Sequence, residues 1–384
     1  MRAAVTILSF CVAALLALGM VMLYSSSMVQ VGARFLLMQL VWCVLGLGCG
    51  VAAILCDYRW LKKIVWPLLA FAVILLLLVF VPHVGIKVKG AHRWIGYGTV
   101  RFEPSELAKL ALLVMLAWYG ERYQRQMHTW KRGILIPGAL MAMVLGLIFV
   151  EPDRGTTVLL ACVGGAMLLI AGVRWRFILP PVFLAAVGLA YSLWHDPMRT
   201  RRIFAWLHLE EQKADAGYQA YQAMLALGAG GLTGVGLGNG RQKLGFVPEH
   251  HTDFILSMIG EELGLVATVL VLIGFIAIVI CGVYIAWHAP DTFGMLLGSG
   301  IALLIGLQAF INIGVVTSAL PNKGLPLPFI SYGGSNLLMM LTCVGVLLSI
   351  ARLARGSEIV TRESAQPAAT ARLGWRDNPF KAQA

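Results

Sequence analysis

The densest group of chemically capable side chains in this chain is the segment Pro248-Glu249-His250-His251-Thr252-Asp253-Phe254, directly before a long apolar run. Carboxylate and imidazole groups are among the side chains that most often give and take protons in enzymes. A carboxylate at a membrane boundary is costly to leave alone, so it usually has a task or a partner. We therefore expect Asp253 to lie where an enzyme can meet a substrate that is partly lipid and partly polar.

A second polar group is carried by Gly90-Ala91-His92-Arg93-Trp94-Ile95 and by Phe102-Glu103-Pro104-Ser105-Glu106-Leu107-Ala108-Lys109. Proline suits the first turn of a helix, so a helix is predicted to begin at Pro104. Glu106 and Lys109 are three residues apart and share one face of that helix. At membrane depth they must face protein or a cavity, as a structural ion pair or as the polar wall of an active cavity.

Two further segments contain residues typical of turns and irregular loops. In Glu151-Pro152-Asp153-Arg154-Gly155-Thr156-Thr157, Asp153 either caps the following helix or helps to hold a phosphate or a cation. In 321–335, three prolines preclude a regular helix. An irregular loop at the membrane face must be buried against protein or line a cavity.

A glycine-rich stretch, 230–240, follows Tyr218-Gln219-Ala220-Tyr221-Gln222. No strand is predicted before these glycines, so we reject a nucleotide-binding loop. Their backbone N–H groups remain able to wrap closely around a ligand.

The helix predicted after Asp253 carries small residues on the same face, at Ser257, Gly260 and Gly264. Such a face either permits close helix packing or leaves a groove in which a lipid chain can lie. Glu262 points the opposite way and is predicted to be structural.

The composition places these motifs in a membrane protein. The chain is 59% hydrophobic and 12% charged, whereas soluble domains carry about 25% charged residues. The net charge of +12 is explained by basic cytoplasmic loops, so we expect no nucleic-acid partner. All seven cysteines fall in or at the end of apolar runs, which predicts neither a disulfide framework nor a zinc site.

We predict an all-α polytopic fold, because ten segments approach the roughly 20 apolar residues that a membrane span needs. They are 5–24, 35–56, 64–82, 105–119, 133–150, 156–173, 178–194, 254–286, 293–319 and 336–352. The eighth is long for one crossing and is expected to tilt or to project into water. Lys and Arg concentrate in alternate loops, which predicts cytoplasmic termini and an extracytoplasmic loop 195–253. Residues 1–355 form the predicted membrane domain, and 356–384 a cytoplasmic tail expected to be disordered.

Together these motifs resemble the SEDS family (shape, elongation, division, sporulation), which are membrane glycosyltransferases of the bacterial cell wall. The resemblance covers most of residues 5–355 in the same order. The context of Lys323-Gly324 and of Ser331-Tyr332-Gly333-Gly334-Ser335 is more like FtsW than RodA. The resemblance implies an enzyme of the cytoplasmic membrane that polymerises lipid II into glycan strands for cell division.

The resemblance also implies a mechanism. The C4 hydroxyl group of one disaccharide attacks the anomeric carbon of the other, and undecaprenyl diphosphate leaves. The aspartate of the family motif Pro-Glu-x-x-x-Asp-Phe, here Asp253, is then the catalytic base. The implied substrate-binding residues are Arg93, Glu106, Lys109, Asp153, Gln222, Glu249, Lys323 and Ser331. We expect no tightly bound cofactor, and a Mg²⁺ or Mn²⁺ ion is a candidate for neutralising the diphosphate.

One position departs from the pattern of the family, which usually has glutamine where Glu151 stands. The departure adds an acid to the turn before Asp153 and leaves the role of that turn open.

Other classes of function make different demands on the sequence. A lipid II flippase or a transporter of lipid-linked substrates needs a polar path through the bilayer, whereas the middles of these spans are nearly free of charge. A scaffold for division proteins has no need of Asp253. Because the chain carries no transpeptidase Ser-x-x-Lys domain, we expect a class B penicillin-binding protein as a partner, besides other division proteins.

Overall fold

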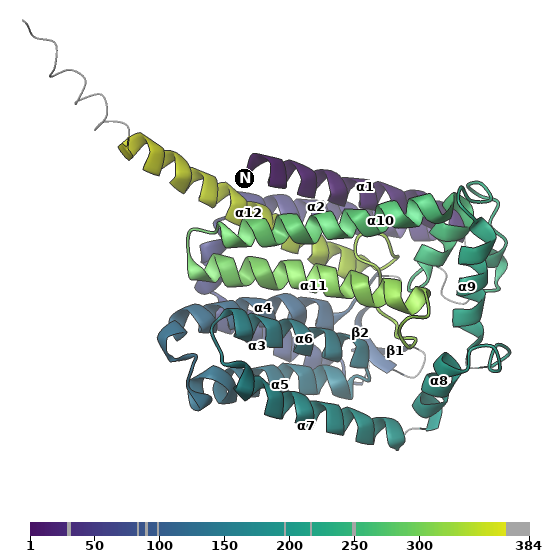
Figure 1. The fold of residues 1–384 in the computed structure, drawn as a ribbon, viewed down its shortest axis with the longest axis horizontal. Helices are drawn as coiled ribbons and strands as arrows, with labels where there is room; N and C mark the ends of the chain where they lie inside the picture. The colour runs from purple at the N-terminus through teal and green to yellow at the C-terminus, as the bar shows by residue number, and fades with distance from the viewer. Residues whose placement is uncertain are drawn as a thin grey trace, which may run out of the picture.

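A computed structural model describes residues 1–28, 32–82, 84–88, 91–97, 100–195, 197–215, 217–247 and 251–365. Each predicted span is a helix in this structure, and these helices run alongside one another (Figure 1). Their bounds are α1 Arg2–Ser27, α2 Arg34–Leu55, α3 Val65–Leu78, α4 Pro104–Arg122, α5 Ile136–Val150, α6 Arg154–Ile170, α7 Trp175–Trp194, α10 Ile255–Trp287, α11 Thr292–Val316 and α12 Gly334–Ala365. The predicted all-α polytopic architecture is therefore confirmed.

Seven helical segments in the described ranges are long and apolar enough to cross a membrane. They comprise α1, α2, α7, α10, α11, the stretch Lys131–Val150 that contains α5, and Gly334–Arg355 of α12. α3 and α6 are apolar but shorter. α4 carries charged residues near both ends, among them Glu106 and Arg122. The chain is a multi-pass membrane protein.

The centre of the bundle lies around α4, α11 and α12. Nearly every residue of α4 from Pro104 to Gly120 is buried, because α3, α6 and α11 pack around it. α12 packs along α2, and α10 packs against α1 and α11. α7 lies at the edge of the bundle and exposes large apolar side chains such as Phe183 and Leu184. An exposed apolar helix of this kind is stable only against lipid or another protein.

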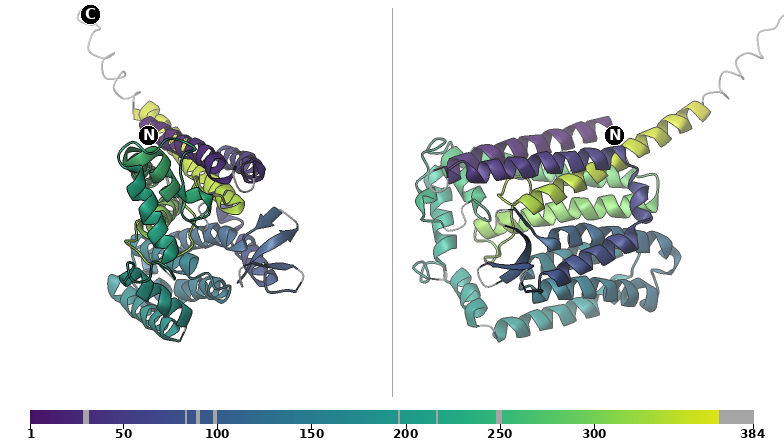
Figure 2. Two further views of the ribbon diagram at one scale, coloured as in Figure 1. Left: turned by 90° about the vertical axis from the view of Figure 1, so that its right-hand side faces the viewer. Right: turned by 180° about the vertical axis from the view of Figure 1, so that it is seen from behind.

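One end of the bundle, which we call the loop-rich end, gathers most of the structure outside the long helices (Figures 1 and 2). It holds helices α8 (Pro197–Leu207) and α9 (Tyr218–Gly230), the short 3-10 helix η4 (Gln242–Leu244) and a small sheet. The N-terminus and the last turn of α12 lie at the opposite end. The other short helices are η1 Tyr58–Lys62, η2 Gln124–Gln126 and the π-helical turn η3 Lys131–Leu135.

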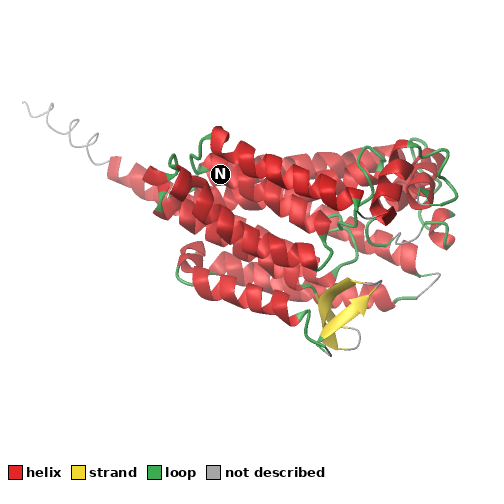
Figure 3. Cartoon of the chain, turned by 90° about the horizontal axis from the view of Figure 1, so that it is seen from below, coloured by secondary structure: helices red, strands yellow, loops and turns green. Residues whose placement is uncertain are grey.

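The sheet consists of three antiparallel strands in the order β1-β2-β3, with bounds Gly85–Val88, Ala91–Tyr97 and Val100–Phe102 (Figure 3). The sheet lies between the predicted spans 64–82 and 105–119, where no strand was predicted, so it is an addition to the predicted fold. Its strands are short and the register shifts between Ile86 and Lys87. Such strands leave little periodic signal in a sequence.

The unusual length of the predicted span 254–286 has a structural cause. α10 contains a break at Gly264, which has φ 78° and ψ −173°. Positive φ at this position needs a residue without a Cβ atom. The section after the break is by itself long enough for one membrane crossing. At the other end of the chain, α12 continues to Ala365, beyond the predicted boundary at 355. The tail 356–384 was expected to be disordered, but residues 356–365 belong to α12, and residues 366–384 lie outside the described residues.

Candidate active site

Asp253 lies at the loop-rich end, just before α10 begins at Ile255. Its backbone is tied to the loop between α11 and α12. Asn312 Nδ2 donates to the carbonyl oxygens of Asp253, at 2.8 Å, and of Leu325, at 2.7 Å. The irregular loop 321–335 is thus buried against protein, one of the two arrangements expected of it.

Ser331 makes a second tie between the same two segments. Its hydroxyl group donates to the carbonyl of Thr252 at 2.6 Å and accepts from the N–H of Leu327 at 2.8 Å. The N–H of Tyr332 donates to the carbonyl of His251 at 3.0 Å. Ser331 is buried, so its hydroxyl group is engaged in holding the Asp253 segment in place.

The loop also passes close to the Asp253 carboxylate at Gly324. A Cβ atom added at Gly324 would lie 2.7 Å from Asp253 Oδ2, so only a glycine allows this approach without a shift. The neighbouring Lys323 is half-buried. Burial lowers the pKa of the Lys323 ammonium group, and the Cys162 thiol of α6 opposes this shift. A partly desolvated ammonium group interacts strongly with a negatively charged ligand.

Glu106 and Lys109 form the predicted ion pair, with Lys109 Nζ 2.8 Å from Glu106 Oε1 and side-chain exposures of only 2% and 3%. Asn336 of α12 donates to both carboxylate oxygens at 3.1 Å. Lys109 also donates to Gln308 of α11 at 3.2 Å, and Gln308 donates to the carbonyl of Pro326 at 2.9 Å. The pair therefore holds α4, α11 and α12 together beneath the loop 321–335, which we call the active-site loop.

Arg93 and Asp153 meet at the turn between α5 and α6. The Arg93 guanidinium group donates to the carbonyls of Glu151 at 3.1 Å and Pro152 at 2.5 Å, which ties β2 to this turn. Asp153 Oδ1 accepts from the N–H of Thr156 at 3.1 Å, so Asp153 is the N-cap of α6. Capping was one of the two roles predicted for this residue, and the structure confirms it.

The glycine-rich stretch wraps around carboxylates of the protein itself. Glu262 accepts from the N–H of Gly238 at 2.9 Å, and Glu261 accepts from the N–H of Arg241 at 2.7 Å. Glu262 also pairs with Lys243 Nζ at 2.7 Å and accepts from the Ser25 hydroxyl group at 2.6 and 2.8 Å. The predicted structural role of Glu262 is confirmed. Of the N–H groups that we expected to face a ligand, that of Gly238 binds a carboxylate of the protein itself, and those of Val235 and Gly236 bind backbone carbonyls.

The break in α10 and the glycine-rich stretch satisfy each other's backbone groups. Gly231 and Leu232 accept the N–H groups of Leu265 and Val266. In return, the carbonyls of Glu261 and Glu262 accept N–H groups of the glycine-rich stretch at 3.0 Å. Unpaired backbone groups are costly at a membrane face, so the break requires this partner.

The face of small residues after Asp253 serves helix packing. A Cβ atom at Gly230 of α9 would lie 1.8 Å from the carbonyl oxygen of Gly260. A Cβ atom at Gly264 would lie 2.4 Å from the N atom of Gly234. Protein therefore fills the groove that was the alternative place for a lipid chain. Of the two predictions, close helix packing is confirmed.

Two predicted site residues in the segment 195–253 have different outcomes. Gln222 lies half-buried on α9. One turn earlier, Gln219 Oε1 accepts from Asn322 Nδ2 at 3.2 Å, so Gln219 links α9 to the active-site loop and was missed. Glu249 falls outside the described residues.

The stacking of Phe35 and Tyr332 against His251, two residues before Asp253, was also not predicted. Phe35 stacks on Tyr332 with ring centroids 4.7 Å apart, and it contacts His251 at 4.9 Å. Burial raises the pKa of the Tyr332 phenol, and the nearby guanidinium groups of Arg34 and Arg101 lower it. Those two side chains are exposed and come from α2 and β3. They add positive charge that the order of residues in the sequence did not predict.

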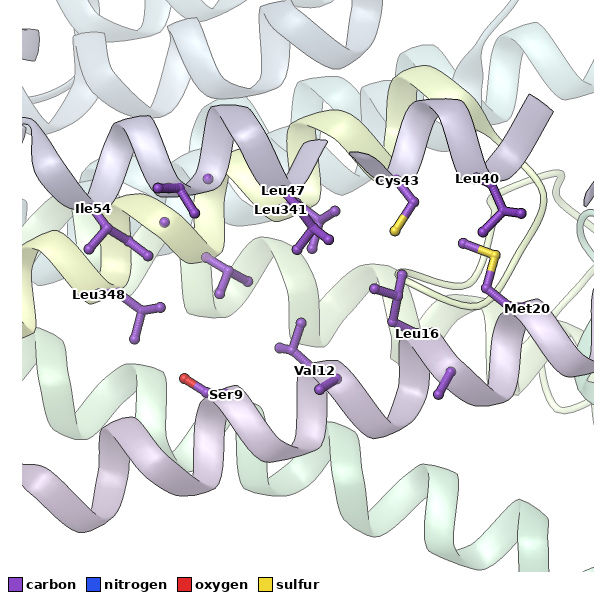
Figure 4. Close-up of a pocket in the computed structure, with 16 residues that line it drawn as sticks. Ser9, Val12, Leu16, Met20, Leu40, Cys43, Leu47, Ile54, Leu341 and Leu348 are labelled. Carbon is purple, nitrogen blue, oxygen red and sulfur yellow. The ribbon is translucent and has the colours of Figure 1, made fainter. Parts of the chain in front are cut away.

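An apolar groove of about 400 Å³ runs between α1, α2 and α12 (Figure 4). Its end near Leu40 and Met20 lies next to Gln39, which donates to the carbonyl of Ser331 at 3.1 Å. Ser9 contributes the one hydroxyl group of its lining. Such a surface within the bilayer suits a hydrocarbon chain.

In the ranges that the structure describes, no group of three or more His, Cys, Asp or Glu residues is arranged to hold a metal ion. The Mg²⁺ or Mn²⁺ ion considered above therefore stays a prediction. Mg²⁺ is often bound by one or two carboxylates together with phosphate groups of the substrate. The donor set in this site suits that type of binding better than a closed protein cage.

Comparison with known proteins places this arrangement among relatives. A family model described as "Cell cycle protein", covering FtsW, RodA and SpoVE, matches residues 6–356. The chain is 41% identical to a protein of Geobacter metallireducens over 350 residues, which are 90% of this chain and 93% of the relative. It is 38% identical to a protein of Coxiella burnetii over 351 residues, 89% of this chain and 94% of the relative. Both relatives are named "Probable peptidoglycan glycosyltransferase FtsW".

Two solved structures have the same fold. One is described as "Structural coordination of polymerization and crosslinking by a peptidoglycan synthase complex", with a TM-score of 0.77 and 30% identity over 90% of this chain and 97% of that chain. The other is the crystal structure of the rod shape determining protein RodA of Thermus thermophilus, with a TM-score of 0.68. It is 30% identical over 90% of this chain and 95% of that chain.

Proposed function

This chain belongs to the family of cell cycle proteins that includes FtsW, RodA and SpoVE, and from that membership we propose that it polymerises lipid II for cell division. It is a peptidoglycan glycosyltransferase, as are the FtsW relatives by name. The proposal adds the substrate, the face of the membrane and the catalytic residue. Polymerisation takes place at the loop-rich end, which we assign to the outer face of the cytoplasmic membrane.

Asp253 is the catalytic base in this proposal. The C4 hydroxyl group of one disaccharide attacks the anomeric carbon of another, the bond from that carbon to the diphosphate breaks, and Asp253 takes the hydroxyl proton. A positioned base contributes about 10²–10⁴-fold to the rate of such a step. The observation that carries the proposal is the placement of Asp253, a partly exposed carboxylate whose backbone is held by Asn312 and whose segment is held by Ser331.

Positive charge around Asp253 suits the leaving group. Lys323 is next in the chain to Gly324, which lies close to Asp253. Tyr332 belongs to the same loop, and Arg34 of α2 and Arg101 of β3 lie near it. Fixed cations stabilise negative charge that develops on a departing diphosphate. In this assignment, Lys323, Arg34 and Arg101 bind the substrate, whereas Glu106, Lys109 and Ser331 position the loop.

The distribution of buried charge favours an enzyme over a transporter. In the described part of the chain, the buried charged side chains all lie at the loop-rich end: Glu106, Lys109, Glu151, Asp153, Lys243, Glu261 and Glu262. A transporter that moves a charged headgroup needs polar groups along its whole path. The helices between the two ends present an apolar interior instead.

Replacement of the proposed base tests this function directly. Asp253→Asn keeps the size of the side chain but removes the basic oxygen, so lipid II polymerisation by the purified protein should fall by at least about 10²-fold. The thermal stability should stay near that of the wild type. Glu211→Gln, an exposed carboxylate on the extracytoplasmic loop, is the matched control and should retain full activity. Wild-type polymerisation by Asp253→Asn would remove Asp253 from the mechanism.

We further propose that the protein works with a class B penicillin-binding protein, and that its termini are cytoplasmic. The similar structure described as a complex that coordinates polymerization and crosslinking supports the first point. Cytoplasmic termini are supported by two observations. The N-terminus and the last turn of α12 lie at the same end of the bundle, and Lys and Arg concentrate in alternate loops. Polymerisation should rise when the transpeptidase is co-purified. Full activity of the isolated chain, with no complex surviving purification, would contradict the partnership.

A further inference from the structure

The outer ends of α4 and α6 hold more carboxylates than cations. Glu106 has Lys109 and Asn336 as partners, and Asp153 caps α6. Glu151 has no such partner, because its side chain is fully buried and neither carboxylate oxygen has a hydrogen-bond donor. The nearest guanidinium group, on Arg93, is directed at the carbonyls of Glu151 and Pro152 and not at the carboxylate.

Glu103 belongs to the same group of acids. It is the residue before α4 begins, and its Oε1 accepts from the Ser105 hydroxyl group at 3.0 Å. The charged side chains that surround Glu103 and Glu151 are Arg93, Glu106, Lys109 and Asp153. Arg154, at the start of α6, lies over the Phe149 ring and leaves its Nε and Nη1 atoms without a partner.

An ionised carboxylate in such a place is unfavourable. For Glu151, burial without a hydrogen-bond donor penalises the charged form strongly, and the neutral acid is then the stable form. Glu103 is half-buried and has the Ser105 donor, and partial burial together with the neighbouring acids disfavours its charged form. Burial, together with the charges of Glu103 and Asp153, raises the pKa of Glu151 to about 8 against the opposing charge of Arg93. Desolvation and the charges of Glu106 and Asp153 likewise raise the pKa of Glu103 to about 8, against the opposing effects of Lys109 and of the Ser105 hydroxyl group.

We propose that Glu103 and Glu151 are neutral carboxylic acids at neutral pH, and that they act as positioning residues for the active-site loop. This inference rests on the proposed function only for its activity readout. Ionisation of both would place two negative charges beside Asp153 and push the turn between α5 and α6 away from the start of α4.

A series of contacts through Leu325 and Asn312 connects that turn to Asp253. A Cβ atom at Gly155, in the first turn of α6, would lie 3.1 Å from the side chain of Leu325. The carbonyl of Leu325 shares the Asn312 amide group with the carbonyl of Asp253. Displacement of α6 therefore moves the loop that holds the catalytic segment.

Substitution by glutamine distinguishes a glutamate that is neutral from one that is ionised and binds a cation. Glutamine has the shape and hydrogen-bonding capacity of a protonated glutamic acid but cannot ionise. If the two glutamates instead bound a cation, the same substitution would abolish that binding and the activity that depends on it.

The pH dependence has a defined sign. Both groups have a higher pKa in the folded protein, about 8, than the value of about 4.3 expected for an unfolded chain. The folded protein therefore binds more protons between these values, so its stability falls as pH rises from about 4.3 to 8 and levels off above. Activity follows the protonation of the folded protein and should decline as pH rises through about 8.

The experiment compares the wild type with Glu151→Gln, Glu103→Gln and the double variant, with Glu211→Gln as the exposed control. Polymerisation and the unfolding temperature are measured from pH 5 to 10, and infrared spectra record the carbonyl stretch of protonated carboxyl groups. We expect each glutamine variant to keep neutral-pH activity within about twofold, to lose part of the alkaline decline and to lose part of the infrared band.

Three outcomes would overturn the inference. One is a folded glutamine variant that is inactive at every pH, which indicates a charged role. Another is an alkaline decline that is unchanged in the double variant. The third is a wild-type spectrum without a carboxyl band that titrates near pH 8, a result that does not depend on any variant folding. The stability and infrared readouts do not require polymerase activity, so failure of the proposed function would be seen separately.

Discussion

Two buried lysine–glutamate pairs lie at the loop-rich end and differ in what they join. Lys109 and Glu106 are three residues apart on α4, with Nζ and Oε1 at 2.8 Å. Lys243 and Glu262 come from η4 and α10, 19 residues apart, with the corresponding atoms at 2.7 Å. Both pairs are almost fully buried, so the attraction within each pair is about equally shielded from water.

The partners around each pair give it a different task. The Glu106 pair binds Gln308 and Asn336, and through Gln308 it supports the carbonyl of Pro326 in the active-site loop. The Glu262 pair binds Ser25 of α1 and the backbone of Gly238, and so it holds the glycine-rich stretch against the break in α10. The same type of ion pair thus supports the loop 321–335 beside Asp253 in one place and anchors the glycine-rich stretch in the other.

The largest effect on stability is expected from breaking the anchoring pair. Glu262→Gln leaves the Lys243 ammonium group buried without a counter-charge and weakens the bonds from Ser25 and Gly238. Removal of one partner of a buried pair lowers the free energy of unfolding by about 3–5 kcal/mol. Unfolding in detergent measures the change against Glu211→Gln. A variant as stable as the wild type would show that this pair does not anchor the loop.

The positioning pair should show itself in the coupling between its members and in activity. Glu106→Gln and Lys109→Met should each reduce stability, and the double variant should depart from additivity by about 0.5–3 kcal/mol. Because Gln308 links the pair to Pro326, polymerisation per folded molecule should also fall, whereas Glu262→Gln should change it less. Additive effects in the double-mutant cycle would indicate that Glu106 and Lys109 do not interact.

An exposed pair gives the lower limit of the comparison. Arg201 of α8 pairs with Asp215 at side-chain exposures of 64% and 50%. Water and salt screen such a pair, so Arg201→Gln or Asp215→Asn should change the free energy of unfolding by less than about 1 kcal/mol. The measurement is the same unfolding transition, repeated at high salt. A loss as large as that of Glu262→Gln would mean that burial does not decide the strength of these pairs.

In both regions, contacts between residues close in the sequence were predicted, and contacts between distant residues were not. The Glu106–Lys109 pair was predicted because two residues three apart on a helix share a face. The cap at Asp153 was an expectation of the same local kind. The Lys243–Glu262 pair was missed because no periodic signal connects a loop lysine with a glutamate inside an apolar run. Gln219 and Phe35 were missed for the same reason, whereas the sheet strands were missed because they are short and irregular.

The sequence by itself determined the membrane helices, the all-α class and the family, since apolar runs of span length and ordered motifs are properties of the linear chain. It also pointed to Asp253, through a motif that is contiguous. Only the tertiary structure decided which groups satisfy the glycine-rich N–H groups, why α10 breaks at Gly264, and why Glu151 is left without a donor. Those outcomes depend on which distant segments pack together, and in a membrane each buried polar group must find its partner within the protein.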